Sequence, residues 1–120
     1  MNVHAIYHRP ESNFCFAISK NSVVLRIRFA KDEDINNLSV LYNSKYDIAK
    51  KQYKASMSFL CCDGTYDYYR AILTLKDPRL AYVFEFFSKG KKYYFVHYIS
   101  YFLLNKNPIN YYIKYFGRKI

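Results

Sequence analysis

Apolar and polar residues alternate at every second position in several stretches of the chain. In residues 22–29, Leu25 and Ile27 fall on one side of the alternation, and Arg26 and Arg28 fall on the other. Because successive side chains of a strand point to opposite faces, this pattern predicts a strand with one buried face. We predict further strands at residues 3–8, 14–18, 35–42, 56–61, 68–75, 80–88, 91–98 and 111–116.

The segments between the predicted strands carry turn signals. Lys89 and Gly90 favour a hairpin between two strands, and Pro78 is well placed for a turn in residues 76–79. The polar residues 47–54 predict a loop or one helical turn, and no long stretch shows a convincing helical period. Short strands at regular spacing over about 100 residues predict an all-β, immunoglobulin-like β-sandwich of about 7–9 antiparallel strands.

Composition supports one folded domain with many aromatic side chains. The chain has 120 residues, of which 52% are hydrophobic, with 15 Tyr and 10 Phe. The three cysteines, Cys15, Cys61 and Cys62, fit neither a complete disulfide framework nor a zinc-binding spacing. We therefore expect reduced thiols in a cytoplasmic protein.

The N-terminus does not open with basic residues followed by an apolar run, so we expect no signal peptide. The longest apolar stretch, residues 93–104, is about 12 residues long and contains His97, which makes it too short and too polar to span a bilayer. Neither secretion nor a membrane partner is indicated.

The net charge is +10, and after Glu85 the chain has bases but no acids. A basic face can attract nucleic acid, and the C-terminal Tyr, Phe and Lys residues would supply base stacking and phosphate contacts. No recognisable nucleic-acid-binding motif occurs, and a solvated surface is the simpler interpretation. A basic, single-stranded nucleic-acid-binding domain is therefore kept only as an alternative.

The polar residues favour no catalytic or metal site. The carboxylates of residues 32–34, Asp63 and Asp67 lie in predicted turns, where solvated or capping roles are more common than catalysis. His4 and His8 share one face of a predicted strand, and we interpret them as structural. No serine or cysteine has an activating pattern, so we expect no enzyme activity, metal or cofactor for this chain alone.

A series of short motifs follows in order along the chain. They are Ala5-Ile6-Tyr7-His8-Arg9-Pro10, Phe14-Cys15-Phe16-Ala17-Ile18, Leu25-Arg26-Ile27-Arg28, Leu41-Tyr42-Asn43-Ser44-Lys45-Tyr46, Met57, Cys62-Asp63-Gly64-Thr65-Tyr66-Asp67-Tyr68-Tyr69-Arg70-Ala71 and Arg79-Leu80-Ala81-Tyr82-Val83-Phe84. Together they resemble the N-terminal domain of neopullulanases, cyclomaltodextrinases and maltogenic amylases, which is the family 34 carbohydrate-binding module of the α-amylase superfamily.

This resemblance implies an immunoglobulin-like domain over residues 1–120. The core sandwich would occupy residues 1–104, and residues 105–120 would form the last strand and the start of a linker towards a catalytic (β/α)₈ barrel that is absent from this chain. The chain departs from the family at Tyr69, where a Trp is usual, and at Ile48, where an aromatic residue often follows the loop tyrosine.

The strongest candidate for a binding residue is Tyr46. It lies in a polar loop beside Lys45, where core burial is disfavoured, and a phenol ring suits the C–H face of a sugar. The resemblance implies that this tyrosine reaches the substrate cleft of a neighbouring subunit in a dimer. Tyr42, Lys45 and Tyr69 are further candidates for substrate binding.

The function that we predict is a non-catalytic domain that binds starch or maltodextrin and forms dimers within a neopullulanase-type α-glucan hydrolase. Its partners would be an α-glucan (maltodextrin, cyclodextrin or starch) and the catalytic barrel of its own or a neighbouring subunit. A purely structural docking domain that touches no sugar is a second alternative.

Overall fold

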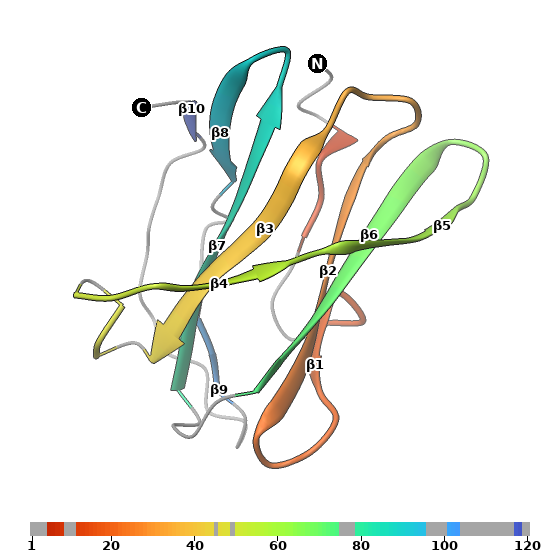
Figure 1. The fold of residues 1–120 in the computed structure, drawn as a ribbon. Helices are drawn as coiled ribbons and strands as arrows, with labels where there is room; N and C mark the ends of the chain where they lie inside the picture. Colours follow the sequence, from red (N-terminus) through yellow and green to blue (C-terminus); the bar gives the residue numbers. More distant parts are fainter. Residues whose placement is uncertain are drawn as a thin grey trace.

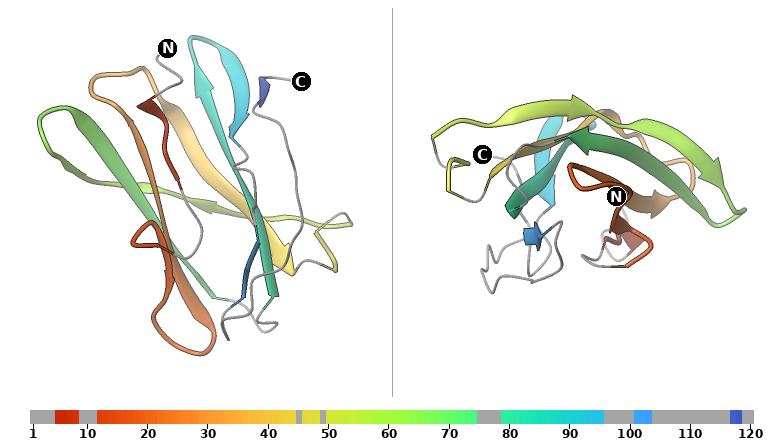
Figure 2. Two further views of the ribbon diagram at one scale, coloured as in Figure 1. Left: turned by 180° about the vertical axis from the view of Figure 1, so that it is seen from behind. Right: turned by 90° about the horizontal axis from the view of Figure 1, so that it is seen from below.

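The computed structural model describes residues 5–8, 12–44, 46–48, 50–74, 79–95, 101–103 and 117–118. These residues form two antiparallel β-sheets that pack against each other (Figure 1; Figure 2). Within the described part of the chain, no helix is long and apolar enough to cross a membrane. The expected two-layer, all-β sandwich is therefore confirmed.

One sheet has four strands, in the order β1 (Cys15–Ala17), β2 (Ser22–Ala30), β6 (Tyr66–Thr74) and β5 (Ser58–Cys62). The longest pairing joins β2 to β6, from Ser22 opposite Thr74 to Ala30 opposite Tyr66.

The other sheet has six strands, in the order β10 (Gly117–Arg118), β8 (Lys91–Phe95), β7 (Arg79–Ser88), β3 (Asn36–Ser44) and β4 (Tyr53–Ser56), while β9 (Tyr101–Leu103) also pairs with β7. The pairing of β3 with β7 runs from Asn36 opposite Phe87 to Ser44 opposite Leu80.

The core lies between the sheets and follows the alternation seen in the sequence. On β2, Leu25 and Ile27 are fully buried, whereas Arg26 and Arg28 on the opposite face are partly exposed. The predicted inward and outward faces of this strand are thus confirmed. Full burial of a large apolar side chain contributes about 1.5–3 kcal/mol. The side chains that β2 and β7 contribute to the core are Val23, Leu25, Ile27, Phe29, Leu80, Tyr82, Phe84 and Phe86.

The predicted hairpin at Lys89 and Gly90 is confirmed. It joins β7 to β8, with Ser88 paired to Lys91. Lys89 has φ of 51° and Gly90 has φ of 79°, and a type I′ turn requires positive φ at both central residues. The strong twist of this turn type matches that of the two strands that it joins.

Residues 56–61 do not form the single strand that we predicted. The chain changes sheets at Met57, whose N–H donates to the carbonyl of Leu38. Before this point β4 pairs with β3, and after it β5 pairs with β6. Figure 1 shows β4 and β5 as one ribbon that crosses from one sheet to the other. Apolar alternation alone cannot locate such a crossing, because both halves keep the same period.

The prediction of a strand at residues 3–8 is wrong for residues 5–8, the part that the structure describes. Only Tyr7 pairs with Arg28, as an isolated bridge. The backbone carbonyl of Ala5 instead accepts a bond from Nε of Arg28, and the His8 side chain turns into the core. Residues 5–8 make these side-chain contacts instead of regular backbone pairing with a neighbouring strand.

Several other predictions lie wholly or partly outside the described residues. They are the strand at residues 111–116, residues 96–98 of the strand predicted at 91–98, the turn at Pro78 and the placement of Lys45. The described residues Gly117 and Arg118 pair with Tyr94 and Tyr93 as β10.

Candidate functional site

The loop that follows β3 is held in place by its own polar groups. The N–H groups of Asp47 and Ile48 donate to the carbonyl of Ser44 at 3.1 and 3.0 Å, and Nδ2 of Asn43 donates to the carbonyl of Lys51 at 2.9 Å. The bond from Ile48 to Ser44 spans four residues, as in a helical turn. This agrees with the prediction of a loop or one helical turn, although Tyr53 and Lys54 at its end belong to β4.

Tyr46 lies after the end of β3, with 56% of its surface exposed. Its backbone N–H donates to Oγ of Ser44 at 3.3 Å. Nη1 of Arg79 donates to its hydroxyl oxygen at 2.6 Å, and the guanidinium carbon lies 4.7 Å from the ring centroid. Tyr46 is therefore an exposed ring that contacts a charged residue at the start of β7.

Tyr42 is half-buried near the end of β3 and packs against the core. Its ring lies 5.8 Å from that of Tyr53 on β4, and Tyr53 is 46% exposed. Nζ of Lys51 lies 5.2 Å from the ring centroid of Tyr53. Sequence reasoning did not select Lys51, Tyr53 or Arg79, which lie near this end of β3. Arg79 belongs to a motif that we quoted for the family, but no local pattern links it to Tyr46.

Tyr69 lies in the other sheet, on β6, and packs partly against the core. Its ring makes edge contacts with Phe29 and Phe59, at centroid distances of 5.8 and 5.7 Å. Burial raises the pKa of the Tyr69 hydroxyl, and the nearby carboxylate of Asp67 adds to this. The structure thus places Tyr42 and Tyr46 near the end of β3, and Tyr69 in the other sheet.

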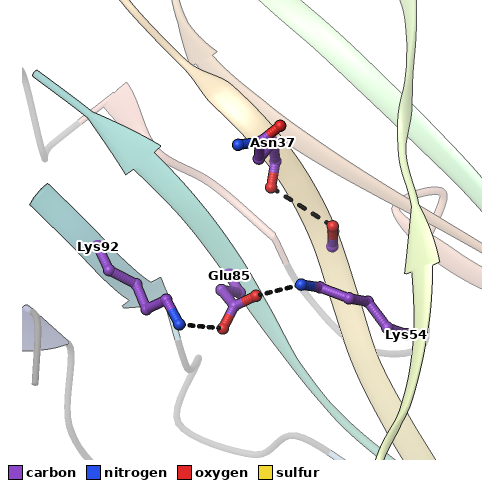
Figure 3. A network of polar contacts seen from close by, with 5 residues as sticks. Asn37, Lys54, Glu85 and Lys92 are labelled. Atoms are coloured by element: carbon purple, nitrogen blue, oxygen red, sulfur yellow. Dashed lines mark hydrogen bonds and ion pairs between the residues drawn. The ribbon is translucent and has the colours of Figure 1, made fainter. Parts of the chain in front are cut away.

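A buried carboxylate lies on the outer face of the six-stranded sheet (Figure 3). Glu85 is only 4% exposed, and its two carboxylate oxygens lie 3.1 Å from Nζ of Lys54 and 3.3 Å from Nζ of Lys92. Burial alone would raise the pKa of Glu85, but the two ammonium groups outweigh it and hold this pKa below its usual value. The cluster connects β4, β7 and β8.

Asp63 and His8 have structural roles. Asp63 accepts bonds from the N–H groups of Thr65 and Tyr66 and from the hydroxyl of Tyr68, and these bonds lower its pKa. The prediction that Asp63 serves a turn is therefore confirmed. His8 is fully buried and hydrogen-bonded, as a structural histidine would be, whereas His4 lies outside the described residues. Among the described residues, no group of three or more His, Cys, Asp or Glu side chains could hold a metal ion.

The cysteines also have clear positions. Cys15 is buried in the core, whereas Cys61 and Cys62 are exposed on the edge strand β5, and none of the three forms a disulfide. The three thiols are therefore unpaired, one of them buried and two exposed.

Residues 1–118 match the family described as "Alpha amylase, N-terminal ig-like domain". The chain belongs to this family. A maltogenic α-amylase of Bacillus acidopullulyticus is 31% identical over 83 residues, which cover 67% of this chain and 14% of that protein. A cyclomaltodextrinase of a Bacillus species is 33% identical over 84 residues, covering 70% of this chain and 15% of that protein.

A solved structure of a cyclomaltodextrinase has the same fold. It superimposes with a TM-score of 0.74 and 31% sequence identity, over 92% of this chain and 18% of that chain. The immunoglobulin-like fold and the resemblance to this enzyme group are thereby confirmed. The chain spans about one seventh of the length of the relatives that it matches. It therefore corresponds to the N-terminal domain of cyclomaltodextrinase-type enzymes.

Proposed function

We propose that this domain is a non-catalytic module that binds α-glucan through the exposed ring of Tyr46 and helps to assemble a larger enzyme. The observation that carries the proposal is the position of Tyr46, which lies exposed in a hydrogen-bonded loop at the end of β3. Aromatic rings with an apolar body and a polar tip suit the alternating C–H and hydroxyl surface of a pyranose.

The family supports the chemical class of the ligand. The matching relatives are named for maltogenic α-amylase and cyclomaltodextrinase. Maltodextrin, cyclodextrin or starch is therefore the ligand that we assign, and the catalytic barrel of the same or a neighbouring subunit is the protein partner. In a dimer of the longer enzyme, Tyr46 would reach the substrate cleft of the neighbouring subunit. We propose that this module is cytoplasmic and needs no cofactor.

Tyr42 and Lys45 are proposed as secondary contacts of the same site, and Tyr69 as a candidate in the other sheet. A platform built on one aromatic ring should bind weakly. An affinity near millimolar corresponds to about 4 kcal/mol.

The experiment is a titration of the 120-residue chain with maltoheptaose and with β-cyclodextrin, followed by NMR shifts of the tyrosine rings. We expect shifts centred on Tyr46, and Tyr46→Ala should weaken binding by about tenfold, which corresponds to about 1.4 kcal/mol. Phe59→Ala is the matched control, because Phe59 is equally exposed at 57% but lies in the other sheet. Binding that is lost with Phe59→Ala and kept with Tyr46→Ala would move the site towards Tyr69.

The two alternatives have separate tests. An absence of sugar-induced shifts at about 10 mM ligand would favour a purely structural docking domain. Tight binding of single-stranded DNA with a steep salt dependence would favour the nucleic-acid alternative. The C-terminal Tyr, Phe and Lys residues on which the nucleic-acid alternative rests lie largely outside the described part of the chain.

A further inference from the structure

We infer that Arg79 is a positioning residue for Tyr46, which fixes the phenol ring in the orientation in which it stacks on a pyranose. This inference rests on the proposed function and deepens it. Arg79 is the first residue of β7, and Tyr46 comes shortly after the last residue of β3. Because Ser44 pairs with Leu80, the sheet register brings these two residues, 33 positions apart in the sequence, to the same end of the sheet.

The contact between them restrains the ring in two ways. Nη1 of Arg79 donates a charge-assisted bond to the hydroxyl oxygen at 2.6 Å, which fixes the polar tip of the ring. The guanidinium carbon lies 4.7 Å from the ring centroid, within the range of a cation–π interaction. A tyrosine in a surface loop would otherwise sample several side-chain rotamers, each with a different ring orientation.

The same contact involves the hydroxyl end of the ring. Because Nη1 bonds the hydroxyl oxygen, the guanidinium lies near that oxygen rather than above the ring centre. Tyr46 is still 56% exposed, so the ring presents surface to a ligand. A flat C–H face, such as that of one glucose ring of a maltodextrin or cyclodextrin, suits this surface.

Fixing the ring before binding lowers the entropy that binding must remove. Ordering one side chain at an interface costs about 0.5–1.5 kcal/mol, so loss of the restraint should weaken binding by about three- to tenfold. Arg79→Lys should recover part of this affinity, because lysine keeps the positive charge but lacks the planar guanidinium that bonds the hydroxyl.

The test uses the full 120-residue chain with maltoheptaose as the probe. Arg79→Ala should raise the dissociation constant by about three- to tenfold, and Arg79→Lys should lie between it and the unchanged chain. In both variants the side-chain couplings of Tyr46 should show averaged rotamers, which a merely structural role would not produce. Arg70→Ala, which removes an exposed arginine of the other sheet, is the matched control and should change neither quantity.

The double variant Tyr46→Ala with Arg79→Ala distinguishes positioning from direct binding. If Arg79 acts through the ring, its loss adds nothing once the ring is absent. Fully additive effects would overturn the inference, as would unchanged affinity in both Arg79 variants while Tyr46→Ala weakens binding. If Tyr46→Ala leaves the affinity unchanged, the proposed function itself fails. If Arg79→Ala does not fold, the Arg79→Lys variant decides alone. An unaltered affinity of that variant, together with a single Tyr46 rotamer, would contradict the inference.

Discussion

Nε2 of His8 lies 2.8 Å from the hydroxyl oxygen of Tyr82 inside the sandwich, where both side chains are fully buried. Nδ1 of the same ring lies 2.7 Å from the carbonyl oxygen of Arg26. A carbonyl only accepts, so Nδ1 carries a proton and donates, and in a neutral ring Nε2 accepts from the Tyr82 hydroxyl. His8 thus connects the N-terminal segment with β2 of one sheet and β7 of the other.

Tyr82→Phe should destabilise the domain, because it leaves the buried Nε2 of His8 without this donor. We expect the free energy of unfolding to fall by about 1–3 kcal/mol, measured by urea denaturation. Tyr53→Phe is the matched control, since it removes a hydroxyl from an exposed tyrosine. Equal stability of the two variants would show that the His8–Tyr82 bond contributes nothing.

Glu85 should make the stability depend on pH in the acid range. Its pKa in the folded state lies below the ordinary value of 4.5. The Glu85 carboxylate is therefore harder to protonate in the folded state than in the unfolded chain. The stabilisation is therefore present above about pH 4.5 and is lost as the pH falls through the folded pKa. The midpoint of thermal unfolding should drop in this window, and Glu85→Gln should show a lower midpoint at neutral pH and a smaller drop.

Asp32→Asn is the control for this prediction, because it removes an exposed carboxylate from a turn. Its acid-dependent drop should match that of the unchanged chain. An identical drop in the Glu85→Gln variant would mean that other carboxylates account for the acid sensitivity.

Arg28 should hold the N-terminal segment against the sandwich. Its guanidinium carbon lies 5.1 Å from the ring centroid of Tyr7 and 3.9 Å from that of Tyr66, and its Nε donates to the carbonyl of Ala5 at 2.9 Å. Arg28→Ala should lower stability by about 1–2 kcal/mol and speed hydrogen exchange at the Tyr7 amide. Unchanged exchange at Tyr7 would contradict this role, and Arg70→Ala serves as the control.

The three thiols should differ in reactivity. Cys61 and Cys62 are exposed on β5, whereas Cys15 is completely buried. A thiol reagent should therefore modify Cys61 and Cys62 in the folded chain and reach Cys15 only after denaturation. Mass spectrometry of the labelled peptides gives the readout, and rapid labelling of Cys15 under native conditions would show that the core opens readily.

Much of the fold was predictable because strand patterning is local. The alternation in residues 22–29 identifies the buried face of β2, since the two faces of a strand are set by the parity of the residue number. The Lys89–Gly90 hairpin is equally local, because two residues with positive φ suffice to reverse the chain. The exposure of Tyr46 also agrees with the polar residues around it.

Other features required contacts between distant residues. The division of residues 56–61 between two sheets depends on whether β3 or β6 is the available neighbour, and alternation carries no such information. The packing of Tyr69 against Phe29 and Phe59 likewise turns a candidate binding residue into a half-buried one.

The sequence by itself determined the all-β class, the inward and outward faces of its clearest strand, and the polar loop that contains Tyr46. The tertiary structure alone decided that Arg79 meets Tyr46 and that His8 joins the two sheets. The physical reason is one of range. Patterning depends on neighbours along the chain, whereas these contacts arise from sheet register and packing, which bring together residues 33 and 74 positions apart.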